Sequence, residues 1–366
     1  MKDTSYVLQK ICSQISLSDT AKANVVREYT SLGKLISNSD LIGCRTEIKP
    51  QGSYNLGTAI MPLNGSDDDF DIDLVAILDE MPTAQKTKIV IGDVLKASDL
   101  YSSKLLPEKK RAWTIDYAKS HVDVVPAVKN DVADISVTNK NSKDNYDYHP
   151  SSPFKFKEWF IEKGQDIYQG STTVKNHIRN EVEQPEEYDQ STILQQVVQL
   201  LKFHRNKMFE NRPDKEKPIS MVITILAAQS YNGQNDLSTA LVEVTNRLRD
   251  QIEYDVQGVP HILNPTNPKE DFTDKWKEHP ERKTAFFEWL QVVERELGTT
   301  NKTNIISWQE TLSKVYGEKR TRNAFNDLGK WRSDIQRRGE IPVNDAGIFE
   351  DEHSDNYVTP NTFWGD

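Results

Sequence analysis

The sequence predicts an α+β fold in two lobes, and three observations support it. Short apolar runs with strand character lie within the first 150 residues, whereas helical spacing of apolar residues dominates beyond them. With 366 residues, the chain is long enough to fill a core in each of two lobes. We expect residues 1–150 to form a first lobe that begins with helices, residues 151–338 a helical second lobe, and residues 339–366 a flexible polar tail.

The first element is predicted to be a helix. Apolar residues recur at three- and four-residue spacing over 25–36, and Ser18 or Asp19 is a suitable N-cap. A turn at Gly52 and Ser53 comes next, where glycine lets the backbone approach a ligand and the hydroxyl can donate to a phosphate. An ordinary turn has the same composition, so this pair is significant only together with the residues after it.

A pair of aspartates opens the strand predicted over 71–78. Asp71 and Asp73 project from one face of that strand and Ile72 from the other. Two carboxylates on one side repel each other unless a cation neutralises them. Mg²⁺ suits such a pair because it prefers oxygen ligands and shares phosphate oxygens with a substrate, and Mn²⁺ could substitute for it. Asp69 has the same spacing to Asp71, so it could join or replace a member of the pair.

A third carboxylate, Asp123, lies in the apolar run 121–126. The strand-like run 112–117 precedes it after a brief turn, so the two runs are expected to form a hairpin beside the Asp71 strand. An edge-strand aspartate that faces water is the alternative interpretation. Three carboxylates at one place could hold two metal ions, one gripping a triphosphate and the other activating an attacking hydroxyl.

The second lobe is predicted from two apolar helical segments over 193–208 and 219–231. Lys202 lies just beside the apolar stripe of the first segment, and Ser220 opens the second, where it could be an N-cap. We expect His204 in the core and Arg205 in an ion pair. Further helices are expected over 83–99, 280–297, 304–315 and 319–338, a loop over 139–153, and a connector over 261–268.

Composition excludes some classes of protein. A net charge of −10 and a pI of about 5.4 argue against a general nucleic-acid binder and favour free nucleoside triphosphates as substrates. A mean hydropathy of −0.68 without a long apolar run argues against a membrane span. The start of the chain lacks the layout of a secretion signal, and its two cysteines have no redox or metal-ligand spacing, so we expect a cytoplasmic protein.

The order of these motifs resembles the polymerase-beta-like nucleotidyltransferase superfamily. Within it, the chain is similar to the bacterial cGAS/DncV-like nucleotidyltransferases of CBASS anti-phage systems, over most of positions 40–275. That resemblance implies a mixed or antiparallel sheet in the core, a helical C-terminal lobe, and a long N-terminal helix that braces both. The segment between the Gly-Ser turn and the aspartate pair is longer than in compact versions of the motif. The segments that carry the resemblance are 52–58, 69–75 and 121–126, supported by 200–206 and 217–228.

The resemblance implies magnesium-dependent synthesis of a cyclic or short linear oligonucleotide messenger from nucleoside triphosphates, with release of pyrophosphate. The messenger would act on a separate effector protein in anti-phage defence, and an operon-encoded regulator could act on the tail of a monomeric enzyme. A nucleotidyltransferase that modifies a protein or RNA acceptor is one alternative, and a catalytically silent nucleotide-binding module is another. The expected catalytic and metal-binding residues are Asp71, Asp73 and Asp123, and the expected nucleotide-binding residues are Gly52, Ser53, Lys202 and Ser220.

Overall fold

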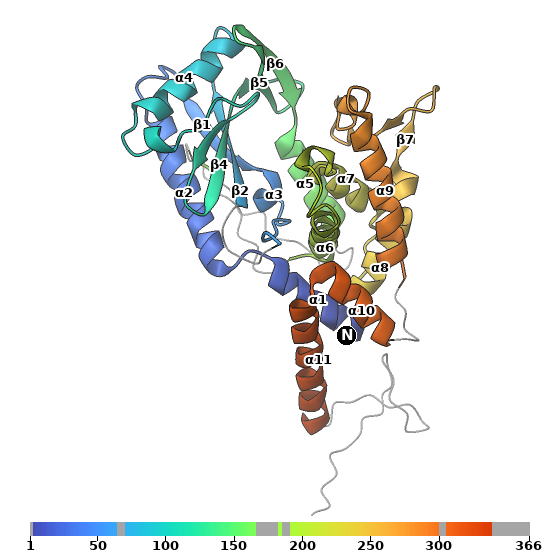
Figure 1. Cartoon of the computed structure of the whole chain (residues 1–366). Coiled ribbons are helices and arrows are strands. Elements are labelled where there is room, and N and C mark those ends of the chain that lie inside the picture. The colour runs from blue at the N-terminus through green and yellow to red at the C-terminus, as the bar shows by residue number, and fades with distance from the viewer. Residues whose placement is uncertain (1–2, 64–69, 166–181, 185–190, 300–304, 339–366) are drawn as a thin grey trace, which may run out of the picture. The chain divides into compact units, whose positions relative to one another are not determined.

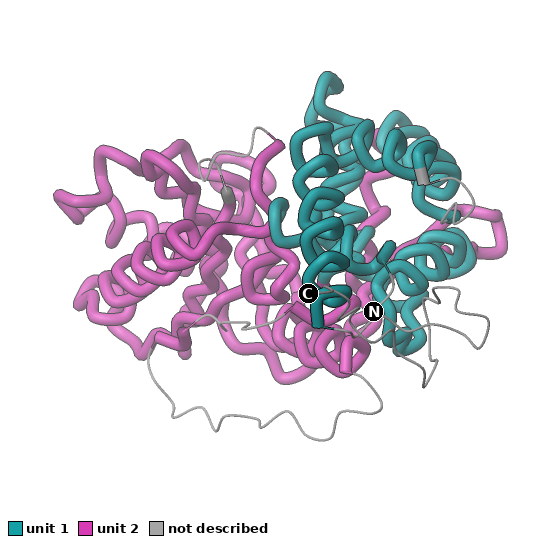
Figure 2. The backbone as a smooth tube through the Cα atoms, turned by 90° about the horizontal axis from the view of Figure 1, so that it is seen from below, with its two compact units in different colours: residues 1–15, 196–251, 280–366 teal, residues 16–195, 252–279 magenta. Residues whose placement is uncertain are grey.

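The chain folds into two compact units, drawn in different colours in Figure 2. A computed structural model describes residues 3–63, 70–165, 182–184, 191–299 and 305–338 (Figure 1). The helical unit comprises residues 1–15, 196–251 and 280–366, and the sheet unit comprises residues 16–195 and 252–279. This division by contacts differs from the lobes expected from the sequence, because the segments 151–195 and 252–279 group with the sheet and residues 1–15 with the helices.

The sheet unit is built around a six-stranded sheet. The strands run in the order β1, β2, β4, β5, β6, and β3 pairs with the first half of β4. The β2 and β4 strands are parallel, whereas every other pair in this sheet is antiparallel. Its elements are α2 (Asp19–Ser37), β1 (Thr46–Gln51), α3 (Gly52–Asn55), β2 (Phe70–Leu78), α4 (Ala84–Ala97), η1 (Ser102–Lys104), β3 (Trp113–Asp116), β4 (Ser120–Lys129), β5 (Ile135–Ser142), β6 (Asn145–Ser151), α5 (Pro153–Gly164), β7 (Glu253–Tyr254), β8 (Pro260–His261), β9 (Leu263–Asn264), β10 (Asn267–Asp271) and η4 (Asp274–Trp276).

The two faces of this sheet have different partners. On one face, here called the helix-side face, α2 packs against β2 and β4, and α4 packs against β4, β5 and β6 (Figure 1). The α2 helix begins where the sequence predicts, because the Ser18 side chain accepts a hydrogen bond from the Ala21 amide. Its apolar stripe from Val25 to Ile36 is buried against strand residues such as Ile72. A smaller apolar cluster lies on the other face, where the odd-numbered residues of β2 and β4 project.

The β5–β6 hairpin corrects one expectation. Residues 139–153 were expected to form a loop, but most of them belong to β5 and β6, which pair along their length. The expectation was wrong because β6 is an edge strand with polar side chains, so backbone pairing leaves no alternation of apolar residues. Two of its aromatic side chains are held by the rest of the unit, since the Tyr148 hydroxyl lies 2.6 Å from the Thr87 hydroxyl and Tyr146 donates to Glu108.

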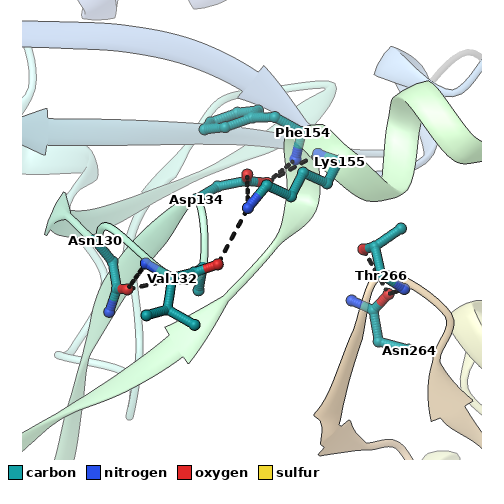
Figure 3. Close-up of polar contacts among 8 residues, drawn as sticks. Asn130, Val132, Asp134, Phe154, Lys155, Asn264 and Thr266 are labelled. Atoms are coloured by element: carbon teal, nitrogen blue, oxygen red, sulfur yellow. Dashed lines mark hydrogen bonds and ion pairs between the residues drawn. The ribbon is translucent and has the colours of Figure 1, made fainter.

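The turn between β4 and β5 also fixes the start of α5 (Figure 3). Asn130 accepts hydrogen bonds from the amides of Val132 and Ala133, which shapes the turn. The Asp134 carboxylate accepts from the amides of Phe154 and Lys155 at 2.8 and 2.9 Å. A side chain remote in sequence thus satisfies the first free amides of α5, a role that no local capping pattern predicts.

Most helices of the helical unit lie where the sequence predicts them. The helices expected over 280–297, 304–315 and 319–338 are confirmed within a residue or two. His204 is buried as expected, with Trp289 donating to its Nδ1 atom at 3.1 Å. No helix in the described part of the chain is long and apolar enough to cross a membrane. The helices are α1 (Asp3–Ile15), α6 (Ile193–Met208), η2 (Asp214–Glu216), α7 (Ser220–Ser230), α8 (Leu237–Arg247), η3 (Leu248–Gln251), α9 (Pro280–Leu297), α10 (Ile305–Tyr316) and α11 (Glu318–Arg338).

Candidate active site

The three predicted aspartates share one face of the sheet. In the parallel register of β2 and β4, Asp73 pairs with Asp123, and Asp71 is two residues before Asp73 on the same side of its strand. Ile72, between them, is buried on the helix-side face, whereas Asp71 is exposed and Asp73 is half-buried. We call the face that carries these carboxylates the aspartate face. Asp69 lies outside the described residues.

The Gly-Ser turn lies directly against Asp73. Gln51, the last residue of β1, pairs with Asp73, and the chain then turns into the short helix α3 at Gly52. Gly52 has φ of +75°, and a Cβ atom there would lie 1.9 Å from Asp73 Oδ2. Glycine is therefore required twice, once for the left-handed backbone and once for the approach of the carboxylate. Ser53 follows in α3, where its carbonyl accepts from the Thr58 amide at 2.9 Å.

Asp123 is held by two neighbours that the sequence did not indicate. The Thr114 hydroxyl donates to Asp123 Oδ1 at 2.5 Å, and Lys109 Nζ lies 3.0 and 3.2 Å from its two carboxylate oxygens. Thr114 could be found only through the register of β3 on β4, which pairs it with Asp123. Lys109 lies in an irregular connection, where no pattern marks it. The alternative of a freely hydrated edge aspartate does not describe Asp123, because β4 is an interior strand.

A second group of charges lies near Asp123. Lys88, on α4, is fully buried, and in the described part of the chain its ammonium has no hydrogen-bond partner. Burial lowers the pKa of Lys88 to about 8, and attraction by Glu108 and Asp123 partly opposes that change. Glu108 itself pairs with Lys140 at 2.5 Å. Lysine side chains thus lie near Asp123, although the chain as a whole carries a net negative charge.

The donor set fits a divalent cation, although one neighbour would have to move. Within the described residues, no group of three or more His, Cys, Asp or Glu side chains is arranged to hold a metal ion as it stands. At Asp123, Lys109 contacts both carboxylate oxygens. The chemistry is nevertheless that of hard-cation sites, with carboxylate oxygens side by side on one face beside a turn that glycine keeps free of side-chain atoms. A metal at Asp123 would displace the Lys109 ammonium.

Lys202 and Ser220 belong to the helical unit, so the structure describes them separately from the aspartates. Lys202 is a buried residue of α6, 4% exposed, rather than a solvated one. Ser220 is the first residue of α7 and not its N-cap, a position that Ile219 occupies without a capping side chain. The Ser220 hydroxyl instead accepts a hydrogen bond from Arg205. That these residues act together with the aspartates stays a prediction.

Another basic residue lies beside the Gly-Ser turn. Lys157, on α5, donates from Nζ to Asn55 Oδ1 at 3.0 Å, at the end of α3. Sequence reasoning missed it because a single lysine on an amphipathic helix resembles any solvated residue. It brings a positive charge to the same turn that carries Ser53.

Comparisons with known proteins show what this chain is similar to. Residues 1–164 match the family model of the Second Messenger Oligonucleotide or Dinucleotide Synthetase domain. A c-di-GMP synthase from Roseivirga ehrenbergii is 27% identical, with 98% of this chain and 96% of that protein covered. The cyclic dinucleotide synthase CdnG from Bradyrhizobium diazoefficiens is 23% identical, with 94% and 88% covered.

Solved structures share the fold at lower identity. CdnG of Bradyrhizobium diazoefficiens in complex with GTP superposes with a TM-score of 0.68 at 19% identity, covering 89% of this chain and 99% of that one. The apo form of Vibrio cholerae DncV superposes with a TM-score of 0.56 at 13% identity, covering 89% and 97%. The shared domain, the relatives that match along nearly the whole chain, and the mixed sheet with its helical unit agree with one another. The chain is therefore similar to bacterial cyclic dinucleotide synthases along nearly its whole length, and it shares the fold of CdnG and DncV.

Proposed function

We propose that this chain is a bacterial cGAS/DncV-like nucleotidyltransferase that joins nucleoside triphosphates into a cyclic oligonucleotide messenger, with release of pyrophosphate. The observation that carries the proposal is the register that sets Asp73 beside Asp123, with Asp71 on the same face and the Gly52 turn against Asp73. The relatives named as cyclic dinucleotide synthases, which match along nearly the whole chain, support this product class. Because one of them is a c-di-GMP synthase, GTP is the first substrate to test.

The aspartate face supplies the chemistry of the transfer step. When bound, two Mg²⁺ ions would neutralise triphosphate charge and lower the pKa of the attacking ribose hydroxyl. Asp71 and Asp73 would hold both ions, and Asp123 would hold the one nearer the acceptor. The Thr114 hydrogen bond restricts how the Asp123 carboxylate can rotate, which preserves its orientation toward the acceptor.

The donor nucleotide would be gripped by its phosphates. The backbone at Gly52 and the Ser53 hydroxyl would bind phosphate oxygens, and Lys202 and Ser220 would orient the triphosphate. The acceptor oxygen then forms a bond to the α-phosphorus while the bond to the leaving pyrophosphate breaks, and the acceptor proton passes to solvent. A second transfer of the same kind closes the ring. Positioning and charge neutralisation would supply most of the rate.

The biological setting follows from the family and stays a prediction. A cytoplasmic monomer would release the messenger in a phage-infected cell, and a separate effector protein would respond to it. An operon-encoded regulator acting on residues 339–366 belongs to the same hypothesis, and these residues lie outside the described part of the chain.

The test is synthesis by the purified full chain. Labelled GTP, ATP, CTP and UTP are incubated with Mg²⁺, and the products are resolved before and after phosphatase treatment. We expect a phosphatase-resistant product that disappears with EDTA and falls by about 100-fold or more in Asp73→Asn and Asp123→Asn. Asp79→Asn is the matched control, because Asp79 lies just past the opposite end of β2 and bonds Lys129.

Three results would count against the proposal. A wild-type chain that forms no phosphatase-resistant product with any nucleotide would refute messenger synthesis. Label that appears on a protein or an RNA instead would favour the modifying nucleotidyltransferase. If Asp73→Asn and Asp123→Asn retain as much activity as Asp79→Asn, the assignment of the aspartate face is wrong.

A further inference from the structure

Arg205 carries a buried charge that no acidic side chain balances. It lies on α6, is 5% exposed, and has no carboxylate within ion-pair distance among the residues the structure describes. The ion pair expected from the sequence is therefore wrong, because Arg205 Nε donates to Asn206 Oδ1 and its other nitrogens donate elsewhere. Burial lowers the pKa of Arg205 to about 10, so the guanidinium remains protonated near neutral pH. A buried cation normally has an anionic partner.

The guanidinium is directed at the start of α7. Nη1 donates to the Pro218 carbonyl, and Nη2 donates to Ser220 Oγ at 3.1 Å. The two nitrogens thus hold both ends of the short turn that leads into this helix. Ser220 is only half-buried.

The direction of the Arg205 hydrogen bond determines which ligands Ser220 can bind. A serine hydroxyl has one proton and two lone pairs. Since Arg205 can only donate, it occupies a lone pair of Ser220 Oγ and leaves the proton for another partner. A phosphate oxygen is an acceptor, so it matches the proton that remains. The first amides of α7 also lack partners within the helix, and they favour the same kind of ligand.

We propose that Arg205 is a positioning residue for the triphosphate: it orients the Ser220 hydroxyl as a donor and places positive charge behind it without touching the nucleotide. This role rests on the proposed function, in which Ser220 contacts the donor nucleotide. Arg205 would then act through Ser220 and not independently of it. That dependence separates positioning from a purely structural contribution to the turn.

The test is a double-mutant cycle on nucleotide binding. The dissociation constant of a non-hydrolysable GTP analogue with Mg²⁺ is measured by calorimetry for wild type, Arg205→Gln, Ser220→Ala and the double variant. We expect about a tenfold increase for each single variant and little further increase in the double variant. In turnover assays KM is expected to rise by a similar factor while kcat changes little. Arg212→Gln, which removes an arginine paired with Glu288 in the same unit, is the charge-matched control and should bind as wild type.

A conservative variant keeps the test decisive if Arg205→Gln does not fold. Arg205→Lys retains the charge but cannot bond the Pro218 carbonyl and Ser220 Oγ with one planar fork. It should show an intermediate loss that again disappears in the Ser220→Ala background. Equal losses in the wild-type and Ser220→Ala backgrounds would overturn the positioning role, even if messenger synthesis is intact. Coupled losses in a chain that binds nucleotide but makes no messenger would retain the role and overturn the synthesis.

Discussion

Replacing Lys88 with methionine should stabilise the protein. Lys88, on α4, is fully buried, and its ammonium lies 5.7 Å from the centroid of the Trp113 ring. Trp113 in turn donates to the Lys88 carbonyl at 2.8 Å, so the helix and the strand are locked together without the charge. Methionine fills a similar volume and makes favourable sulfur–aromatic contacts.

The magnitude follows from the pKa of Lys88, which burial lowers from 10.5 to about 8. A difference of 2.5 units at 1.36 kcal/mol each corresponds to about 3 kcal/mol of destabilisation of the charged, folded state. The cation–π contact with Trp113 is desolvated, so it contributes about 2 kcal/mol in the other direction, and methionine loses it. We therefore expect Lys88→Met to raise the free energy of unfolding by about 1 kcal/mol at pH 7.

The lowered pKa of Lys88 also determines how the stability difference between wild type and Lys88→Met changes with pH. Between pH 8 and 10.5 the unfolded chain binds a proton at Lys88 that the folded chain has lost, so wild-type stability rises with pH across that window. The gain in free energy of unfolding that Lys88→Met has over wild type should be complete below pH 8 and vanish near pH 10.5. Urea unfolding of the full chain at several pH values measures it, with Lys86→Met, an exposed lysine of the same helix, as control. A destabilised Lys88→Met, or a difference that does not change with pH, would refute the reasoning.

Two further predictions concern the site. Gly52→Ala would place a Cβ atom 1.9 Å from a carboxylate oxygen of β2, so we expect messenger synthesis to fall about 100-fold. Gly43→Ala, with similar positive φ and no neighbour within 4 Å, should lose only the stability that the left-handed backbone costs and keep its activity. Lys109→Met frees the Asp123 carboxylate, so the Mn²⁺ concentration for half-saturation in a spin-resonance titration should fall about two- to fivefold. An equal fall in Lys110→Met, which removes the neighbouring exposed charge, would show a general electrostatic effect instead.

The sequence was sufficient to predict features that depend only on residues close to one another along the chain. The α2 helix follows from Ser18 and an apolar stripe, and the hairpin of β3 and β4 follows from two apolar runs with a short turn. The placement of Asp71 and Asp73 on one face needed only the alternation of a strand. Helices and strands each have a fixed repeat along the chain, so the spacing of apolar residues reveals these features.

Features that depend on contacts between remote segments were not predictable in the same way. Arg205 was expected in an ion pair. Its hydrogen bond to Ser220 forms only once the turn before α7 has folded back on α6, so the sequence pattern does not reveal it. Lys109 and Thr114 reach Asp123 from an irregular segment and from a neighbouring strand. The β6 strand escaped detection because its backbone pairs with β5 while its side chains remain polar.

The parallel pairing of β2 and β4 links the core of the sheet unit to its chemistry. Parallel neighbours require a crossover connection, and here the chain between them includes α4, which packs on the helix-side face. Val122 and Val124, on either side of Asp123, are fully buried on that face. A slip of one residue between the strands would bury the Asp123 carboxylate there and expose both valines, which is unfavourable on both counts. The apolar residues under α2 and α4 therefore hold Asp123 in register with Asp73, so the stability of that core and the geometry of the carboxylates are set by the same contacts.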